Sequence, residues 1–466
     1  RIIGGLLSAH LYATDPRKKV YLGDRYSGHL LSRARNLADR LLPVYLTSSG
    51  LPLPRINLRY GFRRFTADMI DENNAAAMAC PMFEFTILSY LTHDDKYRQV
   101  TRYAFDKTWS LRSNLNLLPM SFNPETKSRY CSITGTGASI DSFYEYALKG
   151  AILFNDNELL KVWHKSYRSL NVHAKADWFY VNVNTDWGQV ALPWIDSLSA
   201  FFPGLQVLNG DLEEATIKHT MFLKLWNAYG GIPERWNFQV TERTQKGEII
   251  IKEKDIQVED VIALEWYPLR PEFVESTYFL YRATKDPFYL NIGWNILHDL
   301  NTRFKSNCGF AGIQNVITGV AQDRMETFVL SETLKYLYLL FDEGNELHSD
   351  RGNVVFSTEA HPVWLTRELI DSYEKNRYFK DSAYSNHLKM VKENEVLKKN
   401  EPSFGDLIMG LAKSLFTLTE PANEAIETKE PHKSIYETVE VCPYSSEAKV
   451  THNSLYSEML SSYPAL

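Results

Sequence analysis

The chain has few cysteines, and none of them has the spacing of a metal site or a redox motif. Cys80, Cys131, Cys308 and Cys442 lie far apart in the sequence, without a CxxC pair or a Cys/His cluster. Zinc sites need such clusters, so the spacing argues against zinc. Disulfide pairing stays open, because an oxidising compartment would permit it.

A surplus of positive charge is also missing. The 51 Lys and Arg residues are outnumbered by 57 Asp and Glu residues, which gives a formal net charge of -6. Proteins that hold a phosphate backbone carry a basic stripe or patch, and this sequence shows none. We therefore expect no nucleic acid among the partners.

Long apolar runs are scarce as well. Reading along the chain finds no uninterrupted apolar stretch of about 18 residues, the length that crosses a bilayer, so we expect no membrane span. The chain opens at Arg1 without Met, signal peptide or helix cap, in what reads as the middle of a helix. On this reading the natural chain starts further upstream.

The sequence does contain helical apolar spacing, and 44% of its residues are hydrophobic, enough for a large core. The segments with this spacing are Leu30–Leu42, Phe83–Leu91, Phe143–Phe154, Phe273–Tyr281 and Phe328–Phe341. Several helices end alike, at 90–97, 153–160 and 282–289, in a polar break with an Asp that can cap the next helix. Helical hairpins that recur in this way favour an all-α toroid whose loops build a central site.

Strand-like pieces interrupt the helices at 177–188, at 247–257 and from Asn353 onward, which predicts short β-hairpins in the loops. From about Asp371 the composition becomes rich in Lys and Glu. We therefore predict a barrel over residues 1–370, followed by a partly helical, partly irregular C-terminal extension over 371–466.

Acidic residues stand at the starts of two predicted helices. Asp141 follows a glycine-rich stretch, with Glu145 one turn further on, whereas Glu272 and Glu275 share one face of a later helix. Complementation of the helix dipole would explain Asp141 and Glu272 without any function. It explains Glu275 less well, because Glu275 lies deeper in its helix.

Two further acids, Glu326 and Glu332, lie in or beside a strongly apolar helix. A buried carboxylate needs a cation, a proton or hydrogen bonds. Thr358 and Glu359 stand at the tip of the alternating stretch from Asn353, where an ordinary surface turn is the alternative. Several carboxylates without a Cys or His cluster indicate a hard cation such as Ca²⁺, acid/base chemistry on a sugar, or both.

Several motifs in this order resemble glycoside hydrolase family 47, the class I α1,2-mannosidases, over about residues 1–365. They are "RIIGGLLSAH", "DSFYEYALKGAILF", "FFPGL", "LRPEFVESTYFLYRAT", "DRMETFVLSETLKYLYLLF" and "VFSTEAHP". Within that family the chain looks most like the ER-degradation-enhancing α-mannosidase-like (EDEM) branch, from a fungus. Ser139 replaces an arginine typical of the processing enzyme, so that enzyme's branch preference is not carried over.

The resemblance implies an (α/α)7 barrel with Ca²⁺ at its base and inverting hydrolysis of α1,2-linked mannose. It implies that Asp141 is one catalytic carboxylate and that Glu272 is the general base. Thr358 would be the direct protein ligand of Ca²⁺. The remaining site residues would support the ion through its waters or hold the sugar, and they are Arg1, Arg270, Glu275, Glu326, Phe328, Glu332 and Glu359.

The family also places a candidate general-acid glutamate one helical turn before Arg1, beyond the start of this sequence. We therefore expect that a segment has been omitted or cleaved. Without that acid, classical hydrolysis would be in doubt.

The expected function is removal of terminal α1,2-mannose from high-mannose N-glycans of misfolded glycoproteins in the lumen of the endoplasmic reticulum. An alternative is a lectin-like quality-control receptor that binds mannose without turnover. A third reading, compatible with the first, is a scaffold whose tail and cysteines, Cys80 or Cys442, dock an oxidoreductase of the protein disulfide isomerase type.

Overall fold

The computed structural model describes residues 1–61, 72–238, 241–243, 249–251, 261–349, 354–379 and 382–400. The chain divides into two compact units, Arg1–Phe379 and Lys380–Leu466. In the second unit, the described part is the helix α16 (Ser382–Asn400). Asn353 and most of the strand-like piece predicted at 247–257 lie outside the described residues.

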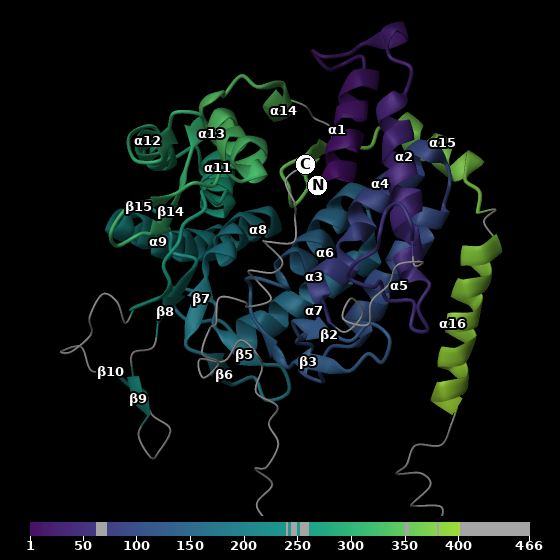
Figure 1. The fold of residues 1–466 in the computed structure, drawn as a ribbon, viewed down its shortest axis with the longest axis horizontal. Helices are drawn as coiled ribbons and strands as arrows, with labels where there is room; N and C mark the ends of the chain where they lie inside the picture. Colours follow the sequence, from purple (N-terminus) through teal and green to yellow (C-terminus); the bar gives the residue numbers. More distant parts are fainter. Residues whose placement is uncertain are drawn as a thin grey trace, which may run out of the picture. The chain divides into compact units, whose positions relative to one another are not determined.

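The first unit is built from helical hairpins, in which each helix packs against the next one along the chain (Figure 1). Its helices are α1 (Ile2–Thr14), α2 (His29–Leu41), α3 (Ala75–Ala79), α4 (Pro81–Thr92), α5 (Lys96–Ser110), α6 (Asp141–Phe154), α7 (Asn157–His173), α8 (Phe202–Asn209), α9 (Leu212–Tyr229), α11 (Glu272–Thr284), α12 (Pro287–Thr302), α13 (Leu334–Phe341), α14 (Glu346–Ser349) and α15 (Arg367–Asn376). This is the predicted all-α architecture of an (α/α)7 barrel, and the prediction is confirmed.

Aspartates at the predicted breaks play two different parts. The side chain of Asp156 caps α7 by accepting from the amides of Glu158 and Leu159, at 2.9 and 3.1 Å. Asp286 caps α12 in the same way. Asp95, in the break at 90–97, caps no helix. Its carboxylate instead binds side chains of its own helix and of α15, as described below.

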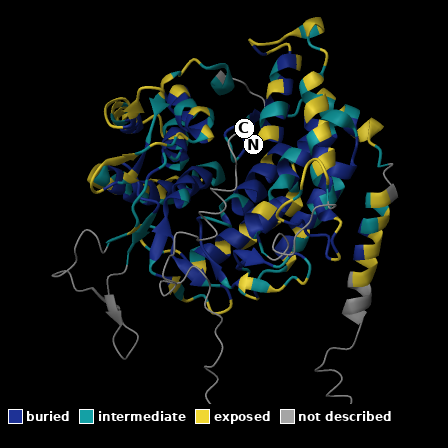
Figure 2. Ribbon diagram, viewed as in Figure 1, coloured by how far each residue is buried: buried dark blue, intermediate teal, exposed yellow. Residues whose placement is uncertain are grey.

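The helices α6 and α11, which we call the inner helices, have most of their residues buried. Residues Phe143–Ala151 of α6 are buried in an unbroken run, which is the pattern of a helix surrounded by others (Figure 2). The window Ala75–Thr92 has the length and mean hydropathy of a membrane-crossing helix, which reading the sequence did not reveal. However, 67% of this window is buried inside the protein, so it is weak evidence for a span.

Short strands fill the loops at the barrel's ends, as predicted. They are β1 (Asn73–Asn74), β2 (Ser121–Phe122), β3 (Arg129–Cys131), β4 (Ile133–Thr134), β5 (Asn182–Asn184), β6 (Val190–Leu192), β7 (Trp194–Asp196), β8 (Arg235–Asn237), β9 (Thr241–Arg243), β10 (Ile249–Ile251), β11 (Ile262–Leu264), β12 (Lys305–Ser306), β13 (Gly309–Phe310), β14 (Gly312–Asn315), β15 (Val320–Gln322), β16 (Val355–Phe356) and β17 (Pro362–Val363). All pairings between these strands are antiparallel. The last hairpin, β16–β17, presents the turn that contains Thr358 and Glu359.

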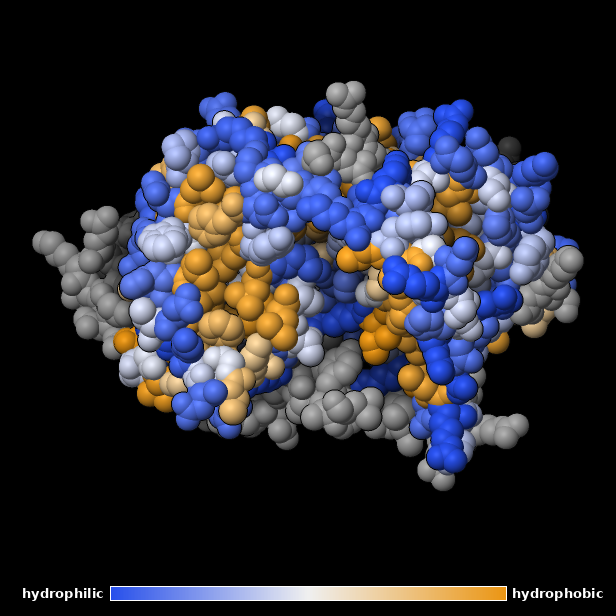
Figure 3. Space-filling view, turned by 90° about the horizontal axis from the view of Figure 1, so that it is seen from above, coloured by the Kyte–Doolittle hydropathy of each residue, from blue (hydrophilic) through white to orange (hydrophobic). Residues whose placement is uncertain are grey.

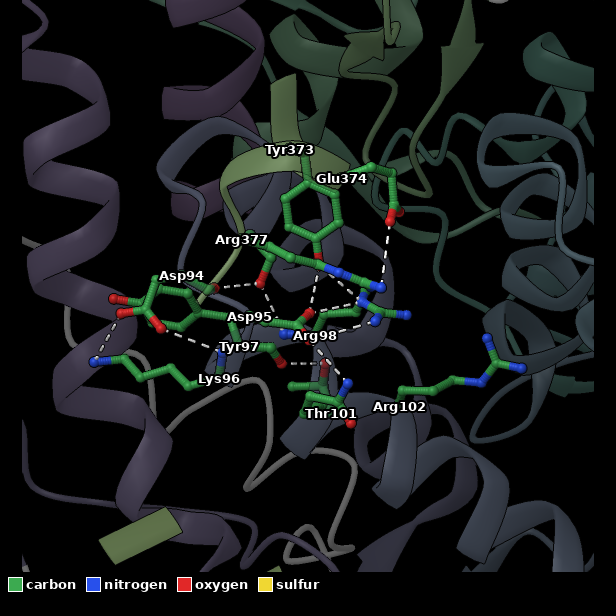
Figure 4. A network of polar contacts seen from close by, with 12 residues as sticks. Asp94, Asp95, Lys96, Tyr97, Arg98, Thr101, Arg102, Tyr373, Glu374 and Arg377 are labelled. Carbon is green, nitrogen blue, oxygen red and sulfur yellow. Dashed lines mark hydrogen bonds and ion pairs between the residues drawn. The ribbon is translucent and has the colours of Figure 1, made fainter. Parts of the chain in front are cut away.

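The helix α15 lies within the first compact unit, Arg1–Phe379. The predicted end of the barrel at residue 370 stays a prediction. The ring of Tyr373 stacks on Tyr90 of α4 with 4.2 Å between centroids. Its hydroxyl donates to the carboxylate of Asp95, which also accepts from Arg98 at 2.8 Å (Figure 4). This network fastens α15 to the α4–α5 hairpin.

The cysteines fall into two groups. Cys80 is half-buried and Cys308 is exposed, and both carry free thiols. Cys131 is disulfide-bonded. Cys442 lies outside the described residues, so the docking role suggested for Cys80 or Cys442 stays a prediction.

We predict that Tyr373→Phe destabilises the protein by about 1.5–3 kcal/mol, because it removes a buried hydrogen bond to a charged carboxylate. Urea denaturation at pH 7 measures the effect. Tyr338→Phe is the matched control, since Tyr338 is 62% exposed, and it should change the free energy of unfolding by less than about 0.5 kcal/mol. Equal effects of the two substitutions would show that the network does not hold α15.

Candidate active site

A cavity of about 200 Å³ lies where the starts of α6 and α11 meet the β16–β17 turn. Its lining residues are Arg1, Asp141, Ser142, Glu145, Leu198, Phe201, Arg270, Pro271, Glu272, Glu275, Phe328, Glu332, Thr358 and Glu359. Six of these residues are acids. The face shown in Figure 3 is hollowed near its centre, with mostly hydrophilic side chains inside the hollow.

Asp141 is the first residue of α6, at the end of the glycine-rich loop. That loop lies against Asp196, whose carboxylate accepts from the amide of Ala138 at 3.1 Å. A Cβ at Gly137 would come within 2.2 Å of the Asp196 carboxylate, which explains the glycine. The pKa of Asp141 is raised to about 7, chiefly by burial; hydrogen bonds from Ser142 act against this rise, and the charge of Asp196 adds to it.

Glu272 is the first residue of α11 and follows Pro271. Burial raises the pKa of Glu272 to about 8; Arg270 lowers it, while Glu234 and Glu275 raise it. Its Oε2 is buried, and among the described residues it has no hydrogen-bond partner. Such an oxygen is unusual in a folded protein and is completed by a proton, a water or a ligand.

Two arginines, Arg1 and Arg270, also line the cavity. Arg1 pairs with Glu359 at 2.7 Å, and Arg270 donates to Glu234 from Nε at 2.7 Å. Their guanidinium carbons lie 5.5 and 5.8 Å from the centroid of the Phe328 ring. The ring therefore lies within cation–π distance of two arginines, each of which has its own carboxylate partner.

Glu332 also lines the cavity, in a π-helical turn, Val329–Thr333, and only 5% of it is exposed. π-helical turns occur often at functional sites. Burial, followed by the charges of Glu359 and Glu272, holds the pKa of Glu332 well above its usual range. The carboxylates around the cavity thus repel one another when they are ionised. A bound cation would offset this repulsion.

The turn between β16 and β17 is held from several sides. The amide of Thr358 donates to the hydroxyl of Tyr146 at 3.1 Å, and Lys335 Nζ donates to the carbonyl of Ala360 at 2.8 Å. The ring of His361 lies against α1, where a Cβ at Gly4 would approach its Nδ1 to 2.9 Å. The α1 glycine therefore permits close packing of the turn on the first helix.

The donors around the cavity are oxygens, the type that Ca²⁺ binds. Among the described residues, no group of three or more His, Cys, Asp or Glu side chains is arranged to hold a metal directly. A cation bound here would therefore need other ligands, and Thr358 can offer a hydroxyl and a carbonyl oxygen. The residues present fit a hard cation that the acids support indirectly.

The structure places nine of the ten predicted site residues in the cavity lining. Glu326 is the one outside it, and it pairs with Arg324 instead. Reading the sequence gave no role to Glu84 or Glu234. Glu84 accepts from the Tyr146 hydroxyl beneath the turn, and burial raises the pKa of Glu84 to about 7. Glu84 could have been found from the sequence, because it is an acid within the apolar segment "PMFEFTIL", as Glu332 is within its own apolar segment.

An acid-lined cavity in an (α/α) barrel suits a protein that acts on sugars, and the relatives agree. Residues 1–365 match glycosyl hydrolase family 47. The solved structure of the alpha-1,2-mannosidase from Trichoderma reesei superposes with a TM-score of 0.68 at 25% identity, covering 78% of this chain and 80% of that one. The chain therefore belongs to glycosyl hydrolase family 47.

Curated relatives refine the branch. ER degradation-enhancing alpha-mannosidase-like protein 1 of Saccharomyces cerevisiae is 57% identical over 468 residues, covering 100% of this chain and 59% of that protein. Alpha-mannosidase I MNS4 of Arabidopsis thaliana is 39% identical, covering 84% of this chain and 60% of that protein. The predicted family and branch are confirmed, and the chain spans about 60% of the length of these relatives.

We predict that the protein without divalent cations loses stability as the pH rises from about 5 to about 8. A carboxyl group whose pKa rises from 4.5 in the unfolded chain to about 8 in the fold stabilises the fold below pH 4.5 and loses this contribution as it ionises. Glu272→Gln stays neutral, so at pH 8.5 it should be more stable than wild type by about 1–4 kcal/mol.

Chemical denaturation at pH 5 and pH 8.5, in the presence of a chelator, measures this difference. The control is Glu158→Gln on α7, whose side chain is 68% exposed. A Glu272→Gln variant that follows the wild-type pH dependence would contradict the prediction.

Proposed function

We propose that this protein hydrolyses terminal α1,2-linked mannose from high-mannose N-glycans, by an inverting mechanism that uses Ca²⁺. The observation that carries the proposal is the pair of buried carboxyl groups, Asp141 and Glu272, which start two inner helices and face one cavity. Membership of family 47 supports the reaction class.

The inverting mechanism needs one carboxyl group to help the leaving oxygen and another to activate a water. With pKa values of about 7 and about 8, Asp141 and Glu272 can each exchange a proton near neutral pH. We assign Glu272 as the general base, because its Oε2 has no hydrogen-bond partner among the described residues and, once the carboxyl group is ionised, can take a proton from water. Asp141 would be a further catalytic carboxylate, beside the candidate general-acid glutamate that the family resemblance places before Arg1.

The mannose ring would lie against Phe328, which is within cation–π distance of the two arginines. The acids Glu275, Glu332 and Glu359 can accept hydrogen bonds from sugar hydroxyls, which carboxylates bind well. Glu326 remains a predicted binding residue, although it lies outside the cavity lining.

Ca²⁺ would be held by Thr358, with the neighbouring acids supporting it through water. When bound, such an ion orients oxygen groups of the sugar and offsets the charge of the acids. The mutual repulsion that raises the pKa of Glu332 is the feature that supports a cation at this place.

The names of the relatives support a proposal about the cellular compartment and the substrates. Several relatives, from Saccharomyces cerevisiae to Homo sapiens, are called ER degradation-enhancing alpha-mannosidase-like proteins. We accordingly propose that the substrates are misfolded glycoproteins in the lumen of the endoplasmic reticulum. An oxidoreductase of the protein disulfide isomerase type is the proposed partner.

We predict that Glu272→Gln lowers kcat for α1,2-mannobiose and for high-mannose N-glycan by about 10²–10⁴-fold, because the general base is lost. Release of free mannose by the full-length protein with Ca²⁺ measures the rate, and Glu158→Gln serves as the unaffected control. Glycan binding by the wild type without any mannose release would instead select the lectin-like alternative.

We predict that Ca²⁺ stabilises the protein through Thr358. At a concentration 100 times the dissociation constant, the ion should add about 2.7 kcal/mol to the free energy of unfolding. Thr358→Val should remove this gain, whereas Thr302→Val, at an exposed position on α12, should keep it. Calorimetric melting with Ca²⁺ and with a chelator measures this stabilisation. If Ca²⁺ stabilises Thr358→Val as much as wild type, Thr358 is not the ligand.

A further inference from the structure

A lysine lies beneath the candidate active site, deep inside the protein. Lys149 follows Glu145 by one turn of α6, and the two residues are 2% and 3% exposed. Burying an ammonium group is costly unless it is paired with carboxylates. A lysine so close to the cavity therefore needs a structural or a functional reason.

Lys149 links carboxylates from two helices. Its Nζ lies 2.5 Å from Glu145 Oε1 and 3.5 Å from Glu275 Oε1. The same oxygen of Glu275 accepts from the hydroxyl of Tyr336 at 3.1 Å. We call Glu145, Lys149, Glu275 and Tyr336 the floor chain; it runs from α6 past α11 to α13.

The lysine in the floor chain is charged. Burial alone would lower the pKa of Lys149, but the charges of Glu145 and Glu275 outweigh it and leave the pKa above its ordinary value. Lys149 therefore acts as a permanent positive charge below the acids of the cavity.

Both partners of Lys149 line the cavity. Glu275 is also three residues after Glu272 on α11, so the two side chains lie on one face of the helix. Lys149 itself is not among the lining residues. Its influence on a bound sugar must therefore pass through the carboxylates that it holds.

We propose that Lys149 is a positioning residue: its ammonium, itself paired with Glu145, fixes the carboxylate of Glu275 so that this carboxylate meets the reacting sugar in one geometry. This inference rests on the proposed function. It gives the floor chain a role in turnover, beyond the stability of two packed helices.

Lys149→Met has a similar length and no charge. It should lower kcat about 100-fold, because small misplacements of site groups cost about that much. KM should change by less than about threefold, because ground-state binding is retained. The matched control is Lys161→Met, which breaks the exposed pair of Lys161 with Glu158 on α7 and should leave both constants unchanged.

A second variant separates positioning from folding. Lys149→Met alone leaves Glu145 buried and unpaired, which destabilises the protein. The double variant Glu145→Gln/Lys149→Met removes that unpaired charge, so its melting temperature should recover while kcat stays low. Recovery of kcat together with the melting temperature would overturn the proposal. So would a Glu145→Gln single variant as slow as the double variant, since it would assign the effect to Glu145.

Crystal structures of the wild type and the double variant test the positioning role without measuring activity. We expect the Glu275 carboxylate to be displaced or to occupy two conformers in the double variant, and an unmoved carboxylate would overturn the proposal. A displaced Glu275 combined with a wild type that releases no mannose would refute the proposed hydrolysis and leave the positioning role intact.

Discussion

Repulsion between buried carboxylates is the constraint around which this barrel is organised. Six acids line one cavity of about 200 Å³, where the low dielectric strengthens every charge. Protonation reduces this repulsion, since the pKa values of Asp141, Glu272 and Glu275 are raised. The positive charges of Lys149, Arg1 and Arg270 reduce it further. A bound metal ion would complete the same balance.

The barrel supplies the rigidity that this balance needs. Asp141 and Glu272 each occupy the first position of a buried helix, so their backbones are fixed by the packing of whole hairpins. The β16–β17 turn adds Thr358 and Glu359 to the same cavity, and it is held by Tyr146, Lys335 and α1.

The helical hairpins and several site residues could be predicted, because they depend on patterns of neighbouring residues in the sequence. Helical spacing indicated the hairpins, and acids at helix starts indicated Asp141 and Glu272. The fastening of α15 by Tyr373 could not be predicted, because Tyr373 and Asp95 are separated by 278 positions in the chain. Glu234 was missed for the same reason, since its partner Arg270 lies on another element. Glu326 shows the converse limit, because a motif does not determine which way a side chain points.

The packing of the β16–β17 turn on α1 joins the two ends of the first unit. The hydroxyl of Ser8 in α1 donates to the carbonyl of Pro362, 354 positions away. In the unfolded chain, bringing two such distant segments together costs conformational entropy that grows with the loop between them. A ligand that contacts both Arg1 and Thr358 would therefore connect the first and last segments of the ring of hairpins. The free energy of unfolding of the whole unit would then increase with occupancy of the site.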